Sequence, residues 1–511
     1  MFVKCFAGAI VGIKAVKVDV EVNVACGGIG LFLVGLPDNA VKESEQRIRS
    51  AFEISQRRMT AKKVVVNLAP ADLRKEGSGF DLPIAVGILA ATQQVVDSRL
   101  ADTMFVGELS LDGAIKPVRG ILPLAVMAKE SGLQRIVVSA DSANEAAVVD
   151  GIEVIPVHTL SEVISYLNSE LDIAPAEGKV SNEEEQQNLY AEDFADVKGQ
   201  RDVKRALEIA AAGGHNVLMI GAPGSGKTML ARRMPTIMPP MSLDEAVEAT
   251  KIHSVAGKLG EDAGLLRKRP FRAPHHLTSQ VALIGGGQSP QPGEVSLAHN
   301  GVLFLDELPE FGRNVLEVLR QPLEDRMITI SRAKYSVEYP SNFTLIGAMN
   351  PCPCGYYNHP TKECSCQPFA INRYFSRISG PLLDRIDMHI EVVPVPLSEI
   401  NGDRVEESSA QIRARVIAAR EIQHRRFEGT SIHSNAMMNS AMLRHFCPLS
   451  GEARALLESA MCRLNLSARA YDRIIKVART IADLAGVENI EPQHIAEAIN
   501  YRTLDRDSWG K

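Results

Sequence analysis

The sequence predicts an α/β fold with a buried parallel sheet, preceded by a second α/β domain and followed by a helical domain. Four short apolar runs predict the sheet, because strands buried on both faces read as continuous apolar segments. These runs are Val217–Ile220, Val302–Leu305, Thr344–Met349 and His389–Val393. The chain has 511 residues, which is too long for one hydrophobic core, so two or three domains are expected.

The N-terminal part, residues 1–170, predicts a separate domain of mixed α/β structure. The segments Val16–Val22 and Lys63–Leu68 are rich in β-branched residues and are predicted as strands. Apolar residues in Asn39–Phe52 and Leu82–Thr92 follow a helical spacing, so both segments are predicted as helices. No repeat of solenoid length is present in the sequence.

An acidic linker is predicted at residues 171–195. Between Ser181 and Ala195 the chain carries Glu183, Glu184, Glu185, Glu192 and Asp193 and no basic residue. The parallel sheet then occupies a domain at 196–400, and a helical lid follows at 401–511. The lid begins with a charged helical stretch at 401–427.

Composition and charge restrict the class of protein. The chain is 45% hydrophobic and 23% charged, which is typical of a globular protein. Its net charge of -6 shows no overall basic excess, so nucleic acid would have to bind at local patches. The N-terminus lacks a signal-peptide core, and no apolar run approaches the roughly 20 residues of a membrane span. We expect a cytoplasmic protein without a membrane segment, in which the 8 cysteines are thiols or metal ligands.

A phosphate-binding loop follows the first apolar run. Its residues are Gly221, Ala222, Pro223, Gly224, Ser225, Gly226, Lys227 and Thr228, which match the pattern G-x-x-x-x-G-K-T. A strand before the loop and a helix after it are the context in which this pattern forms a P-loop. Backbone N–H groups and the helix N-terminus would hold the phosphates of ATP. Lys227 would contact the β- and γ-phosphates, and Thr228 would bind Mg²⁺.

Two later strands end in polar residues that suit ATP hydrolysis. The run Gly301–Leu305 is followed by Asp306 and Glu307, as in a Walker B motif. Asp306 would bind Mg²⁺, and Glu307 would polarise the attacking water. The run that reaches Met349 is followed by Asn350, and this Asn-Pro pair is also typical of a simple turn.

Several further segments resemble the magnesium-chelatase-like AAA+ family, in its ComM/YifB branch. They are Phe271–His276, Gly285–Gly287, Pro292–Gly301, Gly380–Asp387, Leu466–Arg473 and Tyr501–Arg506, with Val34–Pro37, Lys42–Ser44 and Asn67–Leu73 in the N-terminal domain. The resemblance implies that Asn350 is the sensor 1 residue, which orients the attacking water. It also implies that Arg385 is an arginine finger for a neighbouring subunit and that Arg469 is sensor 2. Arg377 is the second candidate for the finger, and Arg473 for sensor 2. A site completed in this way implies a homohexamer.

The N-terminal domain resembles the ribosomal-S5/Lon-protease-like fold. Lon proteases use a Ser nucleophile and a Lys base. In the matching stretch Lys75–Pro83, Phe80 or Asp81 occupies the nucleophile position, and the later stretch Arg119–Ala125 has no Lys at the base position. We therefore expect the fold without protease activity. The alternative is a protease in which Ser78 serves as a displaced nucleophile.

The resemblance implies a hexameric motor that acts on DNA. The segment Thr329–Val337 predicts a hairpin, which in this family points into the ring pore. Arg332 and Lys334 near its tip would contact DNA phosphates, although a solvated surface hairpin has the same sequence pattern. The basic run Arg267–Arg272 lies in the segment that resembles the family insert and is a further candidate. The arginine-rich helix at 411–427 is a weaker candidate, because charged helices are commonly solvated faces.

Four cysteines lie close together in a C-x-C-x₉-C-x-C pattern. They are Cys352, Cys354, Cys364 and Cys366. Four thiolates suit a structural Zn²⁺ in a protein without disulfides. Free thiols and a redox role are the alternatives. His275 and His276 lack the spacing and the third ligand of a metal site, so a hydrogen-bonding role is expected for them.

These observations predict an ATP-hydrolysing, hexameric AAA+ motor acting on DNA. The resemblance implies branch migration or helicase activity in natural transformation or recombination. The alternative is an AAA+ ATPase that remodels a protein partner, as magnesium-chelatase subunits do. The N-terminal domain opposes a chelatase assignment, because chelatase I subunits resemble only the middle and C-terminal parts of this chain.

Overall fold

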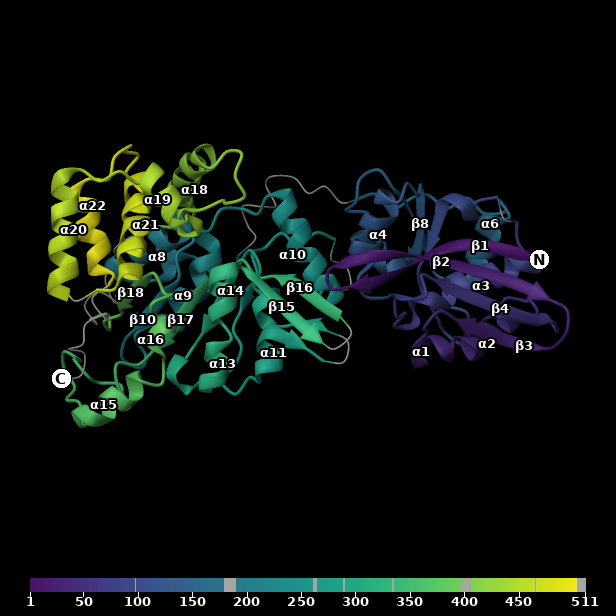
Figure 1. Ribbon diagram of the computed structural model, residues 1–511, viewed down its shortest axis with the longest axis horizontal. Helices are drawn as coiled ribbons and strands as arrows, with labels where there is room; N and C mark the ends of the chain where they lie inside the picture. The colour runs from purple at the N-terminus through teal and green to yellow at the C-terminus, as the bar shows by residue number, and fades with distance from the viewer. Residues whose placement is uncertain are drawn as a thin grey trace. The chain divides into compact units, whose positions relative to one another are not determined.

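The computed structural model describes residues 1–96, 98–178, 190–260, 264–287, 290–332, 335–396, 399, 406–464 and 466–502. The chain forms two compact units. The first contains Met1–Glu183 and Leu243–Leu266, and the second contains Glu184–Ser242 and Arg267–Lys511. Figure 1 labels many of the helices and strands of both units. The acidic residues Glu183, Glu184 and Glu185 and the end of the segment Tyr501–Arg506 lie outside the described residues.

The first unit is built on a mixed sheet with the strand order β3-β4-β2-β1-β5-β8-β9. Its antiparallel pairs are β1 with β2 and β2 with β4, and its other neighbours are parallel. The strands are β1 (Phe2–Val11), β2 (Lys14–Ala25), β3 (Gly30–Val34), β4 (Lys63–Ala69), β5 (Thr103–Phe105), β8 (Arg135–Ser139) and β9 (Glu153–Val157), with a small hairpin of β6 (Glu108–Leu109) and β7 (Ile115–Lys116).

Helices cover this sheet with their apolar residues. They are α1 (Asn39–Lys42), α2 (Ser44–Ile54), α3 (Asp81–Ala91), α4 (Ile121–Glu130), α5 (Ala143–Ala146) and α6 (Leu160–Leu167). Helices α3 and α4 pack against β2, and every residue of α3 is buried. The sequence predicted one helix over Asn39–Phe52, whereas the structure has two helices that meet at Glu43.

The stretch that resembles a protease site forms internal contacts. The Ser78 hydroxyl donates to Glu108. The Asp81 carboxylate is buried and pairs with Arg47, with Nε and Oδ2 2.6 Å apart. The Lys75 ammonium donates to the carbonyl oxygens of Pro70 and Leu73, and burial lowers the pKa of Lys75.

Helix α10 (Leu243–Val255) belongs to the first unit, although the sequence places it within the predicted domain 196–400. It buries Ala246, Ala249 and Ile252 and packs against α4. Ser254 Oγ donates to Glu145 Oε1 at 2.5 Å, and burial raises the pKa of this glutamate. The apolar spacing of α10 predicts a helix, but it does not say which surface the helix covers.

The second unit contains the predicted parallel sheet, with the strand order β11-β14-β17-β10-β18. All four pairs of neighbours are parallel. The strands are β10 (Val217–Ile220), β11 (Phe271–Arg272), β14 (Val302–Leu305), β17 (Thr344–Met349) and β18 (Met388–Glu391). Strand β18 ends at Glu391, earlier than predicted, because its partner β10 ends at Ile220, where the chain turns into the P-loop. The predicted α/β class with a central parallel sheet is confirmed.

The remaining elements of this unit surround the sheet. The helices before residue 400 are α8 (Arg201–Gly213), α9 (Lys227–Ile237), α11 (Gln280–Ile284), α12 (Glu294–Leu297), α13 (Arg313–Glu317), α14 (Arg320–Asp325), α15 (Pro368–Phe375) and α16 (Gly380–Leu383). The hairpins are β12 (Gly285–Gly286) with β13 (Gln291–Pro292), and β15 (Met327–Arg332) with β16 (Tyr335–Pro340).

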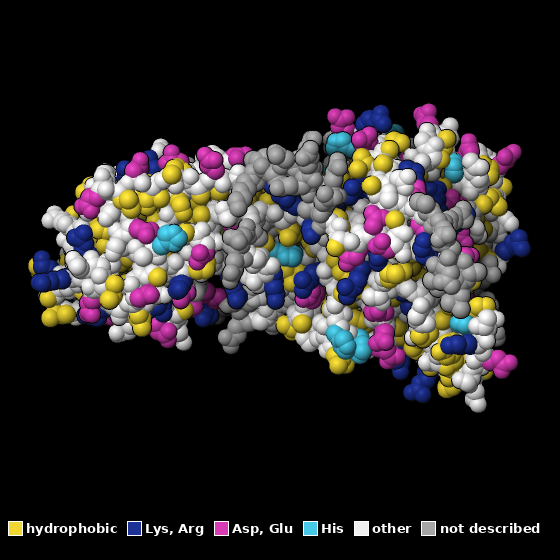
Figure 2. Space-filling model, turned by 180° about the vertical axis from the view of Figure 1, so that it is seen from behind, with side chains coloured by type: hydrophobic (Ala, Val, Ile, Leu, Met, Phe, Trp, Pro, Cys, Tyr) yellow, Lys and Arg dark blue, Asp and Glu magenta, His cyan; other side chains and the backbone are white. Residues whose placement is uncertain are grey.

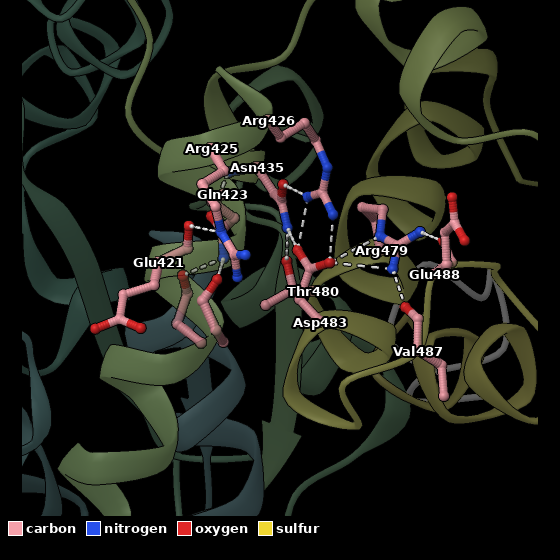
Figure 3. A network of polar contacts seen from close by, with 12 residues as sticks. Glu421, Gln423, Arg425, Arg426, Asn435, Arg479, Thr480, Asp483, Val487 and Glu488 are labelled. Carbon is pink, nitrogen blue, oxygen red and sulfur yellow. Dashed lines mark hydrogen bonds and ion pairs between the residues drawn. The ribbon is translucent and has the colours of Figure 1, made fainter. Parts of the chain in front are cut away.

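The C-terminal region is helical, as predicted. It contains α18 (Ser409–Arg426), α19 (Ser440–Phe446), α20 (Gly451–Leu464), α21 (Ala468–Leu484) and α22 (Pro492–Asn500). Helices α18 and α21 pack against α8, and one hydrophobic core extends from the sheet into these helices. Figure 3 shows a buried polar network that joins α18 to α21 around Asp483. The helical region is therefore part of the same compact unit as the sheet.

Candidate active site

The P-loop closes over the carboxyl end of the parallel sheet. Strand β10 ends at Ile220, and α9 begins at Lys227. Gly224 and Gly226 have φ values of +77° and +92°, the left-handed region that glycine adopts without strain. A Cβ on Gly221 would lie 2.3 Å from the Val392 carbonyl oxygen, so only glycine fits there. The backbone N–H groups at the start of α9 can therefore face a phosphate.

Lys227 connects the P-loop to the end of β17. Its Nζ donates to the carbonyl oxygens of Gly221 at 2.7 Å and Ala222 at 3.0 Å. The same atom lies 3.3 Å from Asn350 Oδ1. Burial lowers the pKa of Lys227, and Asp306 opposes this shift. The structure thus brings together Lys227 and Asn350, two residues that the sequence predicted at one site.

Thr228 and Asp306 form an oxygen-rich pair. Thr228 Oγ1 donates to Asp306 Oδ2 at 2.8 Å. Asp306 Oδ1 accepts from the backbone N–H of Glu307 at 2.9 Å. Hydroxyl and carboxylate oxygens are the ligands that Mg²⁺ prefers, so this pair fits the predicted metal role.

Glu307 contacts a residue that the sequence did not assign to it. Glu307 has left-handed backbone angles, with φ 51° and ψ 46°. Its Oε2 lies 3.2 Å from Nδ1 of His276. His276 follows β11, which pairs in parallel with β14, the strand that leads to Glu307. The contact depends on the pairing of two strands that are distant in sequence. The adjacent residues His275 and His276 were the only signal for it in the sequence.

A cavity of about 440 Å³ lies beside Glu307 and Asn350. Its other lining residues are Glu310, Pro353, Ala370, Arg373, Tyr374 and Arg377. Arg377 NH1 pairs with Glu310 Oε2 at 2.7 Å, so this candidate finger lies near Glu307 of its own chain. Glu310, Arg373 and Tyr374 were not predicted, because neither the segment after Glu307 nor α15, which carries Arg373 and Tyr374, has a motif that marks them.

Arg385 does not join these residues within the chain. Its side chain is 7% exposed, and its guanidinium pairs with Glu324 Oε1 at 2.5 Å. It also donates to the Pro381 carbonyl oxygen at 2.7 Å. Arg469 is exposed near the start of α21.

Arg473 pairs with Asp387, the last acidic residue of the segment that carries Arg385. Burial raises the pKa of Asp387, but Arg473 and His215 outweigh this effect and bring that pKa to about 2. Asp387 also accepts from the backbone N–H of Asn216 at 2.8 Å, directly before β10. The pair therefore ties α21 to the strand that leads into the P-loop.

The four cysteines of the predicted knuckle converge. Their sulfur atoms all lie within 4.8 Å of one another. Cys352 Sγ is 3.3 Å from Cys354 Sγ and 3.7 Å from Cys364 Sγ, and the Cys354 N–H donates to Cys366 Sγ at 3.4 Å. Burial raises the pKa of Cys364 to about 12, whereas hydrogen bonds outweigh burial and lower that of Cys354 to about 6. Four convergent sulfur atoms fit a tetrahedral metal ion.

The hairpin predicted to contact DNA is present. Strands β15 and β16 pair in antiparallel register from Met327 with Pro340 to Arg332 with Tyr335. Lys334 lies outside the described residues, as does the side chain of Arg332. Tyr339, at the base of the hairpin, donates to the Pro290 carbonyl oxygen at 2.7 Å.

The other basic segments form internal contacts. In Arg267–Arg272, Arg269 donates to the Pro239 carbonyl oxygen at 2.6 Å, and Arg272 Nε pairs with Glu294 at 2.6 Å. In α18, Arg415 pairs with Glu208 and Glu407, and Arg426 pairs with Asp483. On the face drawn in Figure 2, basic and acidic side chains are interspersed among the described residues.

The fold and the site define the class of protein. A parallel sheet carries a P-loop whose lysine reaches the end of a neighbouring strand, and a second strand ends in Asp306 and Glu307. This is the arrangement of a P-loop ATPase. Among the described residues, none of the helices has the length and apolar character needed to cross a membrane.

Comparisons with known proteins identify the family. The family model described as magnesium chelatase, subunit ChlI, matches residues 193–400. A model described as subunit ChlI of Mg-chelatase matches 20–142, and one for the ChlI C-terminal part matches 406–502. The chain is 45% identical to competence protein ComM of Haemophilus influenzae, over 98% of this chain and 97% of that protein. The uncharacterized protein YifB of Escherichia coli is 43% identical, over 98% of this chain and 96% of its own length.

The chain therefore belongs to the magnesium-chelatase-like AAA+ family, in its ComM/YifB branch. Membership of this family indicates an ATPase that uses ATP and Mg²⁺. The match to one magnesium-chelatase subunit covers a smaller part of the chain. The magnesium-chelatase 67 kDa subunit of Heliobacterium mobile is 30% identical over 32% of this chain and 29% of its own length.

Proposed function

We propose that the chain is an ATP-hydrolysing motor that acts on DNA in the cytoplasm as a homohexamer. Its role would be branch migration or helicase activity in natural transformation or recombination. The observation that carries the proposal is the 45% identity to competence protein ComM over 98% of the chain. The similarity to ComM includes the N-terminal unit. A model described as subunit ChlI of Mg-chelatase also matches residues 20–142, so the N-terminal unit does not separate a DNA motor from a chelatase subunit, contrary to the expectation from the sequence.

Each residue of the site has a separate role in the proposed hydrolysis. Lys227 and the backbone N–H groups of Gly221–Thr228 would bind the phosphates of ATP. Thr228 and Asp306 would hold Mg²⁺, which neutralises charge on the β- and γ-phosphates when it is bound. Glu307 would polarise the attacking water, and Asn350, 3.3 Å from Lys227 Nζ, would orient it.

A neighbouring subunit would complete the site. Arg385 is held by Glu324 within its own chain, so it would have to exchange this partner for the γ-phosphate of a neighbour. Arg377, the second candidate from the sequence, lines the cavity beside Glu307 of its own chain, which favours Arg385 over Arg377 for a role between subunits. Arg469, exposed near the start of α21, would act as sensor 2.

The hairpin of β15 and β16 is our candidate for the DNA contact. The internal ion pairs of Arg272, Arg415 and Arg426 support this choice, because arginines paired in this way are less available to phosphates. Arg332 and Lys334 would supply the positive charge at the tip. Changing both residues to Glu is expected to weaken DNA binding and to reduce its dependence on salt concentration.

We also propose that Cys352, Cys354, Cys364 and Cys366 hold a structural Zn²⁺. Their convergence within 4.8 Å supports this ligand set. Elemental analysis of protein purified without chelator should find about one zinc ion per subunit. Much less than one would leave free thiols or a redox role as the alternatives.

The ATPase rate, measured without DNA, with single-stranded DNA and with forked DNA, tests the proposed function. We expect both DNAs to raise the rate and the Glu307→Gln variant to remain inactive in all three conditions. Equal rates in all three conditions, from an active enzyme, would favour the alternative of a protein-remodelling ATPase. This alternative is retained because the matching family model is described as a magnesium-chelatase subunit.

A further inference from the structure

The cysteine cluster adjoins three elements of the ATPase site. Cys352 lies two positions after Asn350, the residue that contacts Lys227. Pro353, between the first two cysteines, lines the cavity together with Glu307. Cys366 lies two positions before α15, which carries Arg373 and Tyr374 of the same cavity. A constraint on the cysteines is therefore a constraint on both ends of this segment.

The segment between the cysteines also packs on the P-loop itself. Gly355, directly after Cys354, has a φ of +85°, and its N–H donates to the Cys352 carbonyl oxygen at 3.0 Å. A Cβ at this position would lie 2.6 Å from Cδ and 2.8 Å from Cγ of Pro223. The turn made by the first two cysteines thus rests against the P-loop with no space for a side chain.

We infer that the metal ion of the Cys352–Cys366 cluster sets the shape of the P-loop and thereby controls ATP affinity. The inference rests on the proposed zinc site. A bound ion joins the two ends of the segment and removes most of its conformational freedom. With the ion bound, Gly355 and Asn350 hold Pro223 and Lys227 in place. Without the ion, the P-loop loses this support. The P-loop must then become ordered when ATP binds, and the entropy cost of this ordering lowers the affinity for ATP.

The test compares zinc content with ATP affinity in four proteins. They are the wild type, the Cys364→Ser/Cys366→Ser double variant, Gly355→Ala and Cys462→Ser. Zinc is measured by elemental analysis and ATP affinity by titration with a fluorescent ATP analogue. Cys462 is the matched control, because it is an exposed cysteine in α20, outside the cluster. Circular dichroism during heating reports whether each protein is folded.

We expect the double variant to lose the metal and to bind ATP about tenfold more weakly. Cys462→Ser should keep both the zinc and the ATP affinity of the wild type. Gly355→Ala should keep zinc but also bind ATP more weakly, because the added methyl group displaces Pro223. If the double variant does not fold, the wild type is used instead. Its ATP affinity should fall when a chelator removes the zinc and should recover when ZnCl₂ restores it.

A metal-free, folded protein that binds ATP as tightly as the wild type would overturn the inference. A wild type purified without metal would overturn the zinc site and this inference together. The readout is binding rather than hydrolysis. A protein that shows the coupling but no DNA-dependent ATPase would therefore refute the proposed motor function and leave the metal effect established.

Discussion

Glu307 occupies a backbone conformation that costs energy. A non-glycine residue with φ near 51° is strained, and such strain is of the order of 1–3 kcal/mol. The Asp306 carboxylate, which accepts the Glu307 N–H, and His276, which contacts its carboxylate, hold the residue in this conformation. Strain at this proposed catalytic position is consistent with a side chain that the fold fixes in one orientation.

His276→Ala is expected to reduce kcat for ATP by about tenfold while KM changes little. The reason is that His276 contacts Glu307, whose proposed role is to act on water in the chemical step rather than to bind ATP. His433→Ala is the control, because the His433 side chain is exposed in the helical C-terminal region, whereas the His275 ring lies 4.1 Å from that of His276. Equal losses in the two variants, or a change confined to KM, would contradict this role for His276.

His215 predicts a pH dependence of stability. It is fully buried, its Nε2 is 2.8 Å from Thr480 Oγ1, and burial lowers its pKa from 6.5 to about 4 despite the nearby Asp387. The unfolded chain therefore binds a proton between these pH values, whereas the folded chain does not. Stability is full above pH 6.5 and falls as the pH approaches 4, by about 2 kcal/mol at pH 5.

Urea unfolding at pH 7.5 and pH 5.0 measures this effect, with His215→Gln as the comparison. The variant lacks the titrating group, so its loss of stability between the two pH values should be smaller than that of the wild type by about 2 kcal/mol. Parallel losses in the two proteins would show that His215 is not responsible.

At the scale of the elements, the strands around the P-loop were the most predictable part. β10, β14 and β17 begin and end where the sequence predicted, because each is a short apolar run that ends at a glycine or polar residue, namely Gly221, Asp306 and Asn350. The placement of α10 in the first unit was not predictable, because an apolar helix face does not specify its partner. The contacts of His276 with Glu307 and of Arg385 with Glu324 likewise depend on tertiary packing between distant segments.

The helices of the C-terminal region depend on the charge of Asp483. Its carboxylate accepts from Arg426 at 2.5 and 2.7 Å, from Arg479 at 3.0 Å and from Asn435 at 2.8 Å (Figure 3). Asp483→Asn is expected to lower the free energy of unfolding by about 3–5 kcal/mol, because it leaves the buried Arg479 and the partly buried Arg426 without a counter-charge. Chemical denaturation followed by circular dichroism measures this change.

The control is Asp472→Asn, also in α21, where the carboxylate accepts one hydrogen bond from Ser440 at 3.0 Å. Its expected cost is below about 1 kcal/mol. Similar effects of the two substitutions would mean that the network around Asp483 contributes no more than an ordinary surface hydrogen bond.

At the scale of the whole molecule, the proposed hexamer predicts that defective subunits rescue one another. In the proposed hexamer, Lys227→Ala subunits would lose a contact with the ATP phosphates and Arg385→Ala subunits would lose the finger, so each variant alone should be inactive. A mixture places an intact Arg385 beside an intact P-loop, and its ATPase activity should recover in part. Mixing Arg385→Ala with a Lys227→Ala/Arg385→Ala double variant should restore nothing. Absence of recovery in the first mixture would contradict a finger acting between subunits.

The proposed function requires that ATP hydrolysis at Gly221–Thr228 moves DNA. A strand-displacement assay measures this movement by following a fluorescently labelled strand in a branched DNA while the protein hydrolyses ATP. We expect the wild type to displace the strand only with ATP, and Lys227→Ala not to displace it. A wild-type protein that hydrolyses ATP at the same rate with and without the branched DNA, and releases no strand, would refute the proposed function.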